Sequence, residues 1–455
     1  MTAQTRSRLV GRQRLAIVGS GIAGMTSAHL LHRHHDLTVF EAGDYVGGHT
    51  HTIPVERDGV VYPVDTGFIV FNPDNYPNFV RLLGQLGVES QPTDMSFSVK
   101  STRSGLEYGG ASLRRVFAQP ANLLRPSFHR MLLDIRRFYR EAPELLDSGD
   151  DALTLGAYLD AKGYSRAFVE DHLLPFGAAI WSAAPEDMRA FPARYFVQFF
   201  ANHGFLSLRK PAWRVVQGGS WTYVKALIEP FRHRIRLNTA VRAVRRFDDR
   251  AEVELADGTV EAFDAVILAC HSDQALGLLA DATAAERQIL GPMEYQQNRV
   301  LLHTDDRVLP RRRAAWASWN YHIPGRESDC VSITYNMNLL QGFDSRETFC
   351  VTLNGYEAVD ESRVIREIVY HHPRYTVESV AAQKRHREIN GANRTYFCGA
   401  YWGYGFHEDG VRSALEVGRL FGRDLDGGTR DGAHHQGVLE ARRPATSGAT
   451  TADGS

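Results

Sequence analysis

The chain has 455 residues, which is long enough for two or three domains around a large hydrophobic core. Its 52 basic and 53 acidic residues nearly cancel, so the net charge gives no general attraction to nucleic acid or to acidic membranes. The four cysteines have no CxxC or CxxH spacing, which argues against a zinc site and against a disulfide framework.

No apolar run approaches the roughly 20 residues that span a bilayer. The N-terminus leads directly into the first predicted strand without the apolar core of a signal peptide. We therefore expect a cytoplasmic protein that contacts the inner face of a membrane at most peripherally. We expect no metal site and no nucleic-acid partner.

The stretch LAIVGSGIAGMTSAHLLHRHHDLTVFEA, residues 15–42, has the pattern of a strand, a glycine-rich turn, a helix and a second strand. In such a turn the three glycines permit the tight bend, the close approach of a pyrophosphate and the packing of helix on strand. The phosphates would lie on free N–H groups at the start of the helix. An acidic residue, Glu41, follows at the distance that suits the 2′-hydroxyl of an adenosine ribose and disfavours a 2′-phosphate. The predicted dinucleotide-binding residues are Gly19, Gly21, Ile22, Ala23, Gly24, Glu41 and Ala42.

A second glycine pair, Gly47-Gly48, comes just before His49. A domain that binds only NAD does not require this pair, although an ordinary Gly-Gly turn would also produce it. The segment VYPVDTGFIV, residues 61–70, has the pattern of the strand that follows.

Between residues 73 and 213 the pattern changes to helices and loops. Residues 76–86, 127–140 and 152–159 are helix-like, and the middle one carries apolar residues at i, i+3, i+4 and i+7 spacing. A basic amphipathic helix can lie on a membrane surface, but it is more often a solvated face of a substrate domain. The arginines in and before this helix are Arg114, Arg115, Arg125, Arg130, Arg136, Arg137 and Arg140.

Two aromatic-rich segments, residues 178–182 and 199–204, show no strong periodicity. They are compatible with plain core, and equally with the wall of an apolar pocket in which a few polar groups orient a substrate. The residues that suggest such a pocket are Ile180, Trp181, Phe199, Phe200, Phe205, Trp316, Trp319 and Tyr335.

From Arg214 the pattern returns to strands, at residues 235–246, 251–255 and 264–270, with Asp257-Gly258 as a hairpin turn. Strand-like stretches within residues 276–386 then predict a mixed sheet covered by helices. The last motif is a strand at residues 395–398, a glycine-rich segment, and a helix from about Val411 to Phe421. A helix start at this place can direct N–H groups at a ring on which negative charge develops. From Asp426 to Ser455 the composition predicts disorder.

These elements resemble, in the same order, the FAD-containing amine oxidase and phytoene desaturase superfamily over roughly residues 14–424. More closely, VDTGFIVFN, AWASWNY, ITYNMN and YFCGAYWGYGFHEDGVRSAL are similar to a bacterial branch of FAD/NAD-binding oxidoreductases. Members of that branch are often encoded near cyclopropane-fatty-acid-synthase-like methyltransferases, and some resemble desaturases of methyl-branched fatty acyl chains. The resemblance implies a flavoprotein oxidoreductase with a methyltransferase as a candidate partner.

The implied fold is α/β, with a Rossmann-like FAD-binding domain of the GR2 type and an inserted α+β substrate domain. We expect the FAD-binding domain to be discontinuous, over residues 14–75, 214–275 and 388–424. Residues 76–213 and 276–387 would form the substrate domain, and residues 426–455 the disordered tail.

The resemblance also assigns cofactor contacts. The glycine pair and the residue after it would lie along the pyrophosphate, the Asp-x-Gly segment under the flavin ring, and the backbone of Val241 at the adenine. No His or Cys occupies a position that the superfamily uses for a covalent bond, so we expect non-covalent FAD. The implied residues are Gly47, Gly48, His49, Gly67, Phe68, Ile69, Val241, Ala269, Gly399, Asp409, Gly410 and Val411.

One departure from the amine oxidases is informative. Those enzymes commonly place a lysine near flavin N5, whereas this chain has no lysine between Lys225 and Lys384. Trp402 and Tyr404 could still imitate the aromatic sandwich that holds an amine. Three hypotheses remain: removal of hydride from an apolar substrate, amine oxidation, and a non-catalytic flavin-binding partner of a methyltransferase.

We expect His407 and Glu408 at the flavin end of the site as catalytic candidates, with a helix-capping cluster that includes Asp409 as the alternative. The apolar pocket, with the absent lysine and the arginine-rich segment, favours a fatty acyl substrate, methyl-branched and attached to a phospholipid. The predicted substrate contacts are Trp181, Phe200, Trp319, Tyr335, Trp402 and Tyr404.

Overall fold

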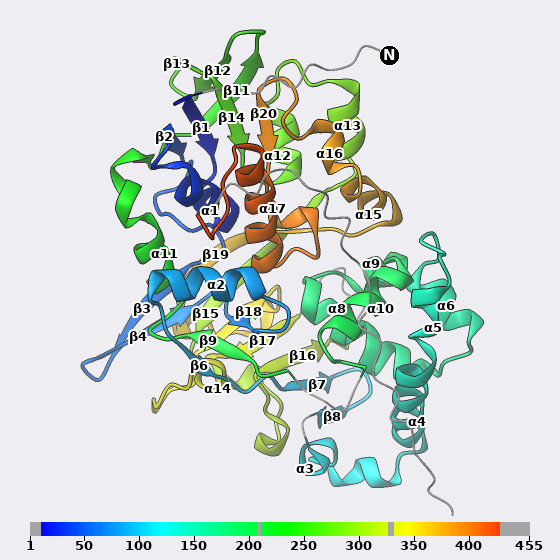
Figure 1. Cartoon of the computed structure of the whole chain (residues 1–455). Helices are drawn as coiled ribbons and strands as arrows, with labels where there is room; N and C mark the ends of the chain where they lie inside the picture. The colour runs from blue at the N-terminus through cyan, green and yellow to red at the C-terminus, as the bar shows by residue number, and fades with distance from the viewer. Residues whose placement is uncertain (1–10, 111, 207–210, 326–331, 428–455) are drawn as a thin grey trace, which may run out of the picture.

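The computed structural model describes residues 11–110, 112–206, 211–325 and 332–427. Its upper half in Figure 1 is built on a five-stranded parallel sheet with the order β10-β2-β1-β14-β20. Apart from the exposed Arg14, the central strands are buried on both faces, which is why their sequences are short continuous apolar runs. The strands are β1 (Arg14–Val18), β2 (Asp36–Phe40), β10 (Ile235–Arg236), β14 (Ala265–Leu268) and β20 (Thr395–Phe397).

Two cores cover this sheet, because alternate residues of each strand point to opposite faces. Leu15 and Ile17 pack against helices on one face, and Ala16 and Val18 pack on the other face against a three-stranded antiparallel sheet and further helices. The first group of helices is α1 (Ile22–Leu31), α2 (Pro77–Leu86), α11 (Trp221–Ile228) and α17 (His407–Leu420). The second face is covered by β11 (Val241–Arg246), β12 (Ala251–Leu255), β13 (Val260–Phe263), α12 (Ser272–Leu278), α13 (Ala284–Leu290), α15 (Val377–Gln383) and α16 (His386–Ile389).

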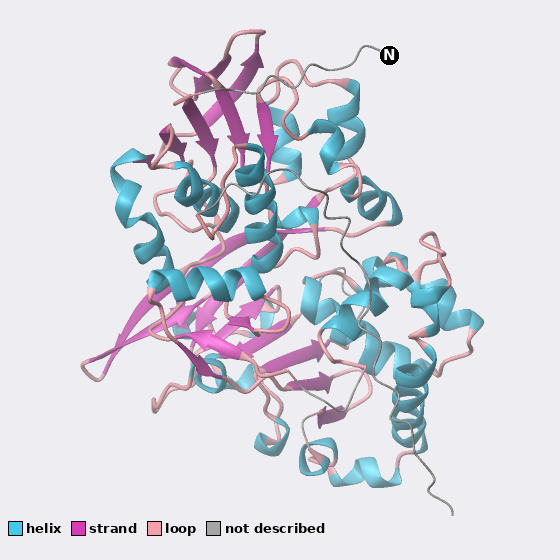
Figure 2. Ribbon diagram, in the orientation of Figure 1, coloured by secondary structure: helices cyan, strands magenta, loops and turns pink. Residues whose placement is uncertain are grey.

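The lower half of Figure 2 contains a seven-stranded mixed sheet with the order β19-β15-β18-β17-β16-β7-β8. Strands β16 and β7 pair in parallel, and the other neighbours pair antiparallel. The strands are β7 (Phe97–Ser101), β8 (Leu106–Gly109), β15 (Tyr295–His303), β16 (Trp319–Ile323), β17 (Ile333–Asn336), β18 (Cys350–Leu353) and β19 (Val364–Pro373).

A helical layer lies beside this sheet and shares one aromatic-rich core with it. Its elements are α3 (Leu113–Val116), η1 (Pro120–Leu124), α4 (Pro126–Glu141), α5 (Glu144–Asp147), α6 (Leu155–Ala161), α7 (Arg166–Phe168), η2 (Val169–Leu173), α8 (Leu174–Trp181), α9 (Pro185–Ala190) and α10 (Ala193–Asn202). The amphipathic pattern of the arginine-rich helix is present in α4, which buries Phe128, Met131 and Phe138.

Smaller elements complete the two halves. They include the hairpin β3 (Thr52–Arg57) and β4 (Val60–Asp65), the small sheet of β5 (Val70–Phe71), β9 (Arg214–Val216) and β6 (Ser90–Pro92), helix α14 (Met337–Gln341), and the short turns η3 (Glu229–Arg234), η4 (Asp306–Val308), η5 (Arg313–Ala315), η6 (Tyr356–Ala358), η7 (Glu361–Arg363) and η8 (Ala400–Trp402). Among the described helices, none is both long and apolar enough to cross a bilayer.

The structure confirms the predicted fold class of a parallel Rossmann-like sheet with an α+β insertion. All strands of the parallel sheet fall within residues 14–75, 214–275 and 388–424, and all strands of the mixed sheet fall within the two intervening segments. Helices α2 and α13 were expected in the substrate domain, but their apolar residues complete the cores of the parallel sheet. Helix α15 was also expected there, and it contributes Ala382 to a core of the parallel sheet and Val380 to the core of the mixed sheet. The tail predicted to be disordered lies, from residue 428 on, outside the described residues.

Candidate active site

A cavity of about 680 Å³ runs between the parallel sheet and the mixed sheet. One end lies at the carboxyl ends of β1, β2 and β14, where the strand order reverses and where open α/β sheets bind their ligands. The other end reaches α8, α10 and β16. The cavity therefore has a nucleotide end, built by the parallel sheet, and a substrate end, built by the inserted segments.

The glycine-rich turn at the nucleotide end is shaped for a phosphate group. Gly19 has φ +102°, and a Cβ on it would lie 2.9 Å from the carbonyl oxygen of Ala269. A Cβ on Gly24 would lie 2.0 Å from the carbonyl oxygen of Gly19, so Gly24 packs the helix on the strand and does not line the cavity. A Cβ on Gly21, in contrast, would meet nothing within 4 Å and would project into open space. No side chain caps α1 at Gly21, which leaves the helix start available to an anion.

Glu41 lies at the end of β2 with its carboxylate fixed at the cavity wall. Its Oε2 accepts hydrogen bonds from the N–H and the hydroxyl of Ser20, and its Oε1 accepts from the N–H of Gly43 at 2.8 Å. Val241 lines the cavity nearby, at an irregularity in the pairing of β11 with β12. A ribose hydroxyl and an adenine at this end would therefore meet the residues that the sequence predicts.

The second glycine pair closes over the turn. A Cβ on Gly48 would lie 3.2 Å from the Cα of Gly21, and Gly47 has φ +125°, so both positions require glycine. Gly67 approaches the backbone of His49 more closely still, because a Cβ on Gly67 would lie 2.2 Å from the carbonyl oxygen of His49. Phe68 and Ile69 follow it into the cavity wall.

Helix α17 begins at His407 and not near Val411, so the catalytic candidates occupy its first turn. His407 lines the cavity and stacks on Phe68 with ring centroids 3.5 Å apart. Its Nε2 lies 2.9 Å from the hydroxyl of Thr50 and 3.0 Å from that of Tyr223. Burial, with a smaller contribution from His49, holds the pKa of His407 well below its usual value. The imidazole is therefore neutral and weakly basic.

Glu408 faces away from the cavity, which corrects its expected position. Its carboxylate accepts hydrogen bonds from the N–H groups of Asn78 and Phe79 and from the side chain of Asn78. It thus caps the start of α2. Asp409 accepts from the N–H of Phe406 at 3.0 Å and pairs with Arg412 at 2.7 Å, which matches the capping alternative.

Other residues that were predicted to contact cofactor or substrate also do not line the main cavity. Gly410 packs against Ile22, and Val411 is buried in the core on α1. Phe200 stacks on Phe196 inside the aromatic core, and Trp402 stacks on His386 with centroids 3.9 Å apart, away from the main cavity. The predicted residues that do line the cavity are Gly19, Gly21, Ile22, Ala23, Glu41, Ala42, Gly47, Gly48, His49, Gly67, Phe68, Ile69, Val241, Ala269, Gly399, His407, Ile180, Trp181, Phe199, Phe205, Trp319, Tyr335 and Tyr404.

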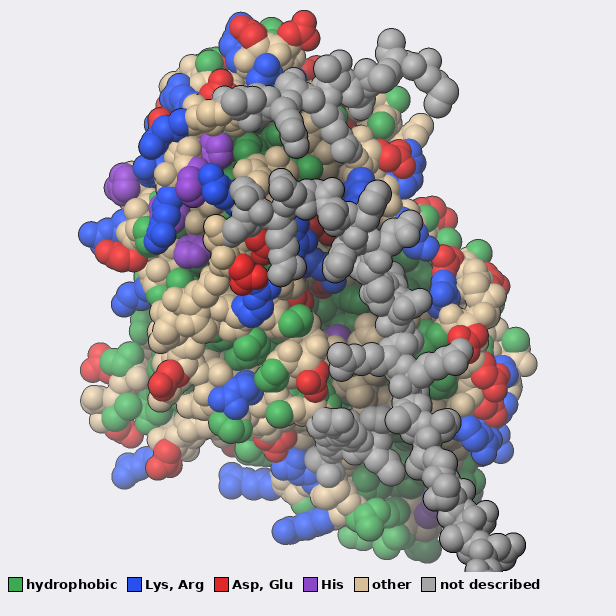
Figure 3. All heavy atoms as spheres, in the orientation of Figure 1, with side chains coloured by type: hydrophobic (Ala, Val, Ile, Leu, Met, Phe, Trp, Pro, Cys, Tyr) green, Lys and Arg blue, Asp and Glu red, His purple; other side chains and the backbone are tan. Residues whose placement is uncertain are grey.

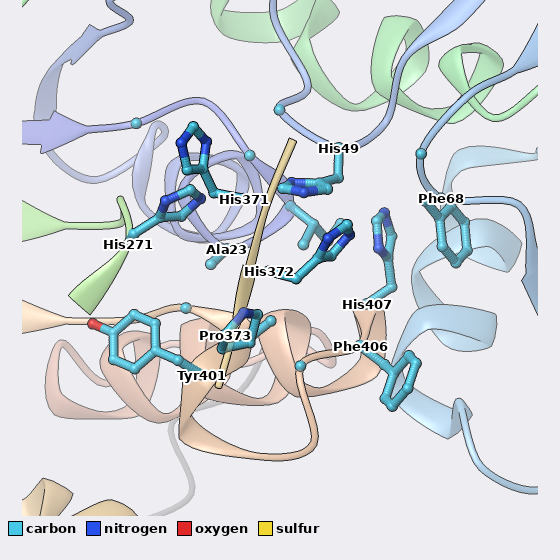
Figure 4. A pocket seen from close by; sticks show the side chains of 18 of the residues that line it. Ala23, His49, Phe68, His271, His371, His372, Pro373, Tyr401, Phe406 and His407 are labelled. Carbon is cyan, nitrogen blue, oxygen red and sulfur yellow. The ribbon is translucent and has the colours of Figure 1, made fainter. Parts of the chain in front are cut away.

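Four histidines gather between the two ends of the cavity, as Figure 4 shows: His49, His271, His371 and His372. The ring of His49 lies 5.3 Å from that of His372 and 6.3 Å from that of His271. Burial first, and the neighbouring imidazoles second, lower the pKa of His49 and His372 to about 3 and that of His271 to about 4.

The rings of His49, His271 and His372 are therefore neutral near pH 7, and each can donate one N–H bond to an uncharged or anionic oxygen. The Nε2 of His49 is buried without a partner among the described residues. Such an atom is expected where a bound group supplies the missing partner. The site thus fits a cofactor that carries phosphate and carbonyl oxygens.

Sequence reasoning missed three of these histidines. His271 follows β14 at the carboxyl end of a parallel strand, and that position was a usable signal. His371 and His372 end β19 of the other sheet, and only the approach of that strand to the cavity reveals them. Trp316, which was expected in the pocket, does not line the cavity, and its Nε1 donates to the carbonyl of Pro310.

The substrate end is lined by aromatic and aliphatic side chains. The ring centroid of Phe199 lies 5.3 Å from that of Tyr404 and 5.2 Å from that of Phe406. Several polar atoms interrupt this wall, including the hydroxyl groups of Tyr335 and Tyr404 and one ring nitrogen each of Trp319 and His203. The Nε1 of Trp319 is buried without a partner among the described residues, and the Nδ1 of His203 lies 3.0 Å from the carbonyl of Phe199. Among the described lining residues, Glu41 at the opposite end carries the one charged side chain.

Solved structures of low sequence identity share the fold. A putrescine oxidase double mutant matches with a TM-score of 0.65 at 15% identity, covering 90% of this chain and 99% of its own. A fatty acid isomerase from P. acnes matches at 0.64 and 17%, covering 91% and 100%. Cyclohexylamine oxidase from Brevibacterium oxydans matches at 0.63 and 14%, covering 90% and 98%.

No curated protein matches the sequence. The family described as flavin containing amine oxidoreductase matches residues 22–348, more than half of the chain. That match covers helix α1, the second glycine pair with His49, and most of the substrate end. Gly19 and Gly21 lie just before it, and His371 and His372 lie after it. The protein therefore belongs to the flavin-containing amine oxidoreductase family and is an FAD-dependent oxidoreductase.

Proposed function

We propose that the protein removes hydride from a carbon of a neutral, hydrophobic substrate, and that this substrate is a fatty acyl chain which gains a double bond. FAD, when bound, would accept the hydride from one carbon, and the neighbouring carbon would release a proton to solvent as the double bond forms. The observation that carries the proposal is the absence of charge from the described lining of the substrate end. A neutral chain of methylene groups gains free energy on entering such a cavity, at roughly 0.8 kcal/mol per buried CH₂.

An amine would be poorly served by the same lining. In water most amines are protonated, and burying an ammonium group without a paired carboxylate is costly. The one carboxylate in the described wall, Glu41, is held at the nucleotide end by Ser20 and Gly43. The proposed aromatic sandwich is also incomplete, because Trp402 packs on His386. The fold does not decide, since an amine oxidase and a fatty acid isomerase both share it.

A free carboxylate at the end of the substrate is disfavoured for a related reason. Among the described lining residues there is no lysine and no arginine to pair with it. We therefore infer that the acyl chain enters with its head group esterified, as in a phospholipid. A methyl branch, which a methyltransferase of the kind suggested by the sequence resemblance would supply, increases delocalisation at the carbon that loses hydride.

The roles of the residues follow from their places. Phe199, Tyr404 and Phe406 exclude water and hold the chain by contact. The N–H of Trp319 gives one hydrogen bond to an oxygen of the substrate. The start of α1 at Gly21 holds the pyrophosphate. His407, held by Thr50 and Tyr223, fixes the wall at Phe68.

The test is expression in cells supplied with a methyl-branched unsaturated fatty acid, followed by mass spectrometry of their lipids. We expect a new dienoic species that is two mass units lighter than its precursor. Cells that express Gly21→Val provide the control for flavin dependence. Turnover of an amine panel by the purified protein, without any new lipid species, would contradict the proposal in favour of amine oxidation.

A further inference from the structure

The helical layer exposes an unusual set of leucines at one edge of the molecule. Leu124 is 87% exposed, Leu113 is 79% exposed and Leu133 is 65% exposed, and these are the highest values for large apolar side chains among the described residues. Leu123 beside them is 55% exposed. Figure 3 shows hydrophobic side chains gathered at the bottom of the view, over the region of α3 and the start of α4.

Short helices and side-chain hydrogen bonds hold these leucines toward solvent. Between Leu113 and Leu133 the chain forms α3, η1 and α4, and Pro120 and Pro126 begin the last two elements. The side chain of Asn122 is buried and donates to the carbonyl of Glu107 at 3.0 Å, which leaves the next two residues, Leu123 and Leu124, facing solvent. The Nε2 of His129 lies 2.9 Å from the carbonyl of Leu123 and joins η1 to the exposed face of α4.

The surroundings of the leucines are basic. Residues 112–133 contain four arginines and no acidic residue. A second basic segment, Arg311-Arg312-Arg313, is far away in the sequence but leads into η5, which packs against α3. Gly109 lies between the two elements, because a Cβ on it would be 3.3 Å from both the Cβ of Arg115 and the carbonyl oxygen of Ala315. Arg115 has Asp94 at 3.4 Å, whereas Arg114 and Arg312 form no ion pair with any described residue.

We propose that this leucine–arginine surface, formed by Leu113, Leu123, Leu124, Leu133, Arg114, Arg125 and Arg312, binds the surface of a bilayer that contains anionic phospholipid. Apolar side chains flanked by arginines suit the boundary between head groups and acyl chains, where leucines insert and arginines meet phosphates. A protein partner would meet the same leucines, but the arginines on both sides match the charge of anionic lipid. The inference does not depend on the reaction, because binding to vesicles needs no turnover.

The experiment is sedimentation of the flavin-loaded protein with vesicles of phosphatidylcholine alone and with vesicles of equal parts phosphatidylcholine and phosphatidylglycerol. We expect binding to the mixed vesicles to be at least about tenfold stronger, and to weaken as salt increases. Equal binding to both vesicles, or none, would overturn the proposal.

Two double variants separate the contributions. Leu123→Asp with Leu124→Asp removes the inserting groups, and Arg114→Glu with Arg312→Glu reverses charge, and each should weaken binding to mixed vesicles by about tenfold or more. Val61→Asp is the matched control, since Val61 is 58% exposed on the β3–β4 hairpin at another edge of Figure 1. Flavin absorbance checks that each variant is folded.

A loss confined to the arginine variant would contradict insertion of the leucines. A dimer in solution that Leu123→Asp with Leu124→Asp dissociates would assign the surface to a second copy of the chain and would also overturn the proposal. A negative lipid profile in cells, with vesicle binding intact, would count against the proposed reaction alone.

Discussion

The two ends of the cavity are built in different ways. The nucleotide end consists mainly of backbone: glycines at contact distance from carbonyl oxygens, the uncapped start of α1, and one fixed carboxylate. The substrate end consists of side chains that come from α8, α10, β16, β17 and the segment before α17. The first kind of wall has strict local requirements, and the second has only a requirement for apolar volume.

This difference explains what each end tolerates. A position such as Gly24 admits no other residue, because even a methyl group would overlap a backbone oxygen. An apolar wall accepts exchange of one hydrophobic side chain for another at modest cost if volume is conserved. The cofactor end is thus constrained to one chemistry, whereas the substrate end can change its specificity without a change of fold.

The largest effect on cofactor binding should come from a substitution at the nucleotide end. Gly21→Val should abolish FAD binding, with a loss of affinity of at least about 100-fold, because the new side chain projects into the open space over the helix start. The flavin-free protein should keep its fold, since no protein atom lies within 4 Å of the new Cβ. Flavin absorbance of the purified protein, together with thermal unfolding, measures both quantities.

The matched variant is Gly24→Val, whose Cβ would lie 2.0 Å from the carbonyl of Gly19. It should destabilise the whole domain and not only the cofactor site. Equal behaviour of the two variants would show that the glycines are not divided between cofactor approach and helix packing.

The substrate end should respond to charge. Ile180→Asp places a carboxylate in the apolar wall on α8, and we expect the KM for a neutral acyl substrate to rise by about 100-fold, because an unpaired buried charge is costly. Ile180→Asn has nearly the same shape without the charge and should have the smaller effect. Steady-state kinetics with flavin occupancy as the control measures this. An improved KM for an amine in the Asp variant, from an appreciable starting activity, would favour the amine hypothesis.

Most of the residues that the sequence predicts for the nucleotide end line one cavity, and they could be recognised because their requirements are local. The spacing from Gly19 to Glu41, the glycine pair and the segment at Gly67 each need only a few neighbouring residues to be recognised. Of the substrate contacts, Phe200 and Trp402 were placed wrongly because an aromatic residue in the core and one in a pocket have the same sequence signal. Glu408 was misplaced because the helix begins earlier than its apolar pattern, so the carboxylate reaches Asn78 and Phe79.

The histidines between the two ends connect stability to pH. Burial lowers the pKa values of His49, His271 and His372 in the folded state to about 3 or 4. In the unfolded chain the pKa of each of these histidines is about 6.5. The unfolded state therefore binds more protons than the native state between about pH 4 and 6.5. Their contribution to stability is complete above about pH 6.5 and is lost as the pH falls, by about 1.4 kcal/mol per pH unit for each histidine.

Thermal or urea unfolding across this range should show that slope, and His271→Asn should reduce it. A bound pyrophosphate near these rings would favour their protonated forms, so the slope should be smaller in the flavin-bound protein than in the flavin-free protein. Identical slopes in the two forms would show that the histidines do not lie close to the bound cofactor.

The smallest effect on the reaction should come from His407, which lies where the two ends meet. A general base there would make His407→Ala slow flavin reduction by about 100-fold or more. Two observations predict a different result: the Nε2 is already within hydrogen-bond distance of Thr50 and Tyr223, and burial keeps the imidazole a weak base. We expect flavin reduction at saturating substrate to slow by less than about tenfold, while stability falls by about 2 kcal/mol, because the buried ring on Phe68 and its two hydroxyl contacts are lost. Thr50→Val, which removes one of those contacts and keeps the imidazole, should reproduce part of the loss of stability and none of the loss of rate. Rapid-mixing absorbance measures the rate of flavin reduction, and thermal unfolding measures the stability. If His407→Ala slowed flavin reduction by about 100-fold and left the stability unchanged, the imidazole would be the catalytic base.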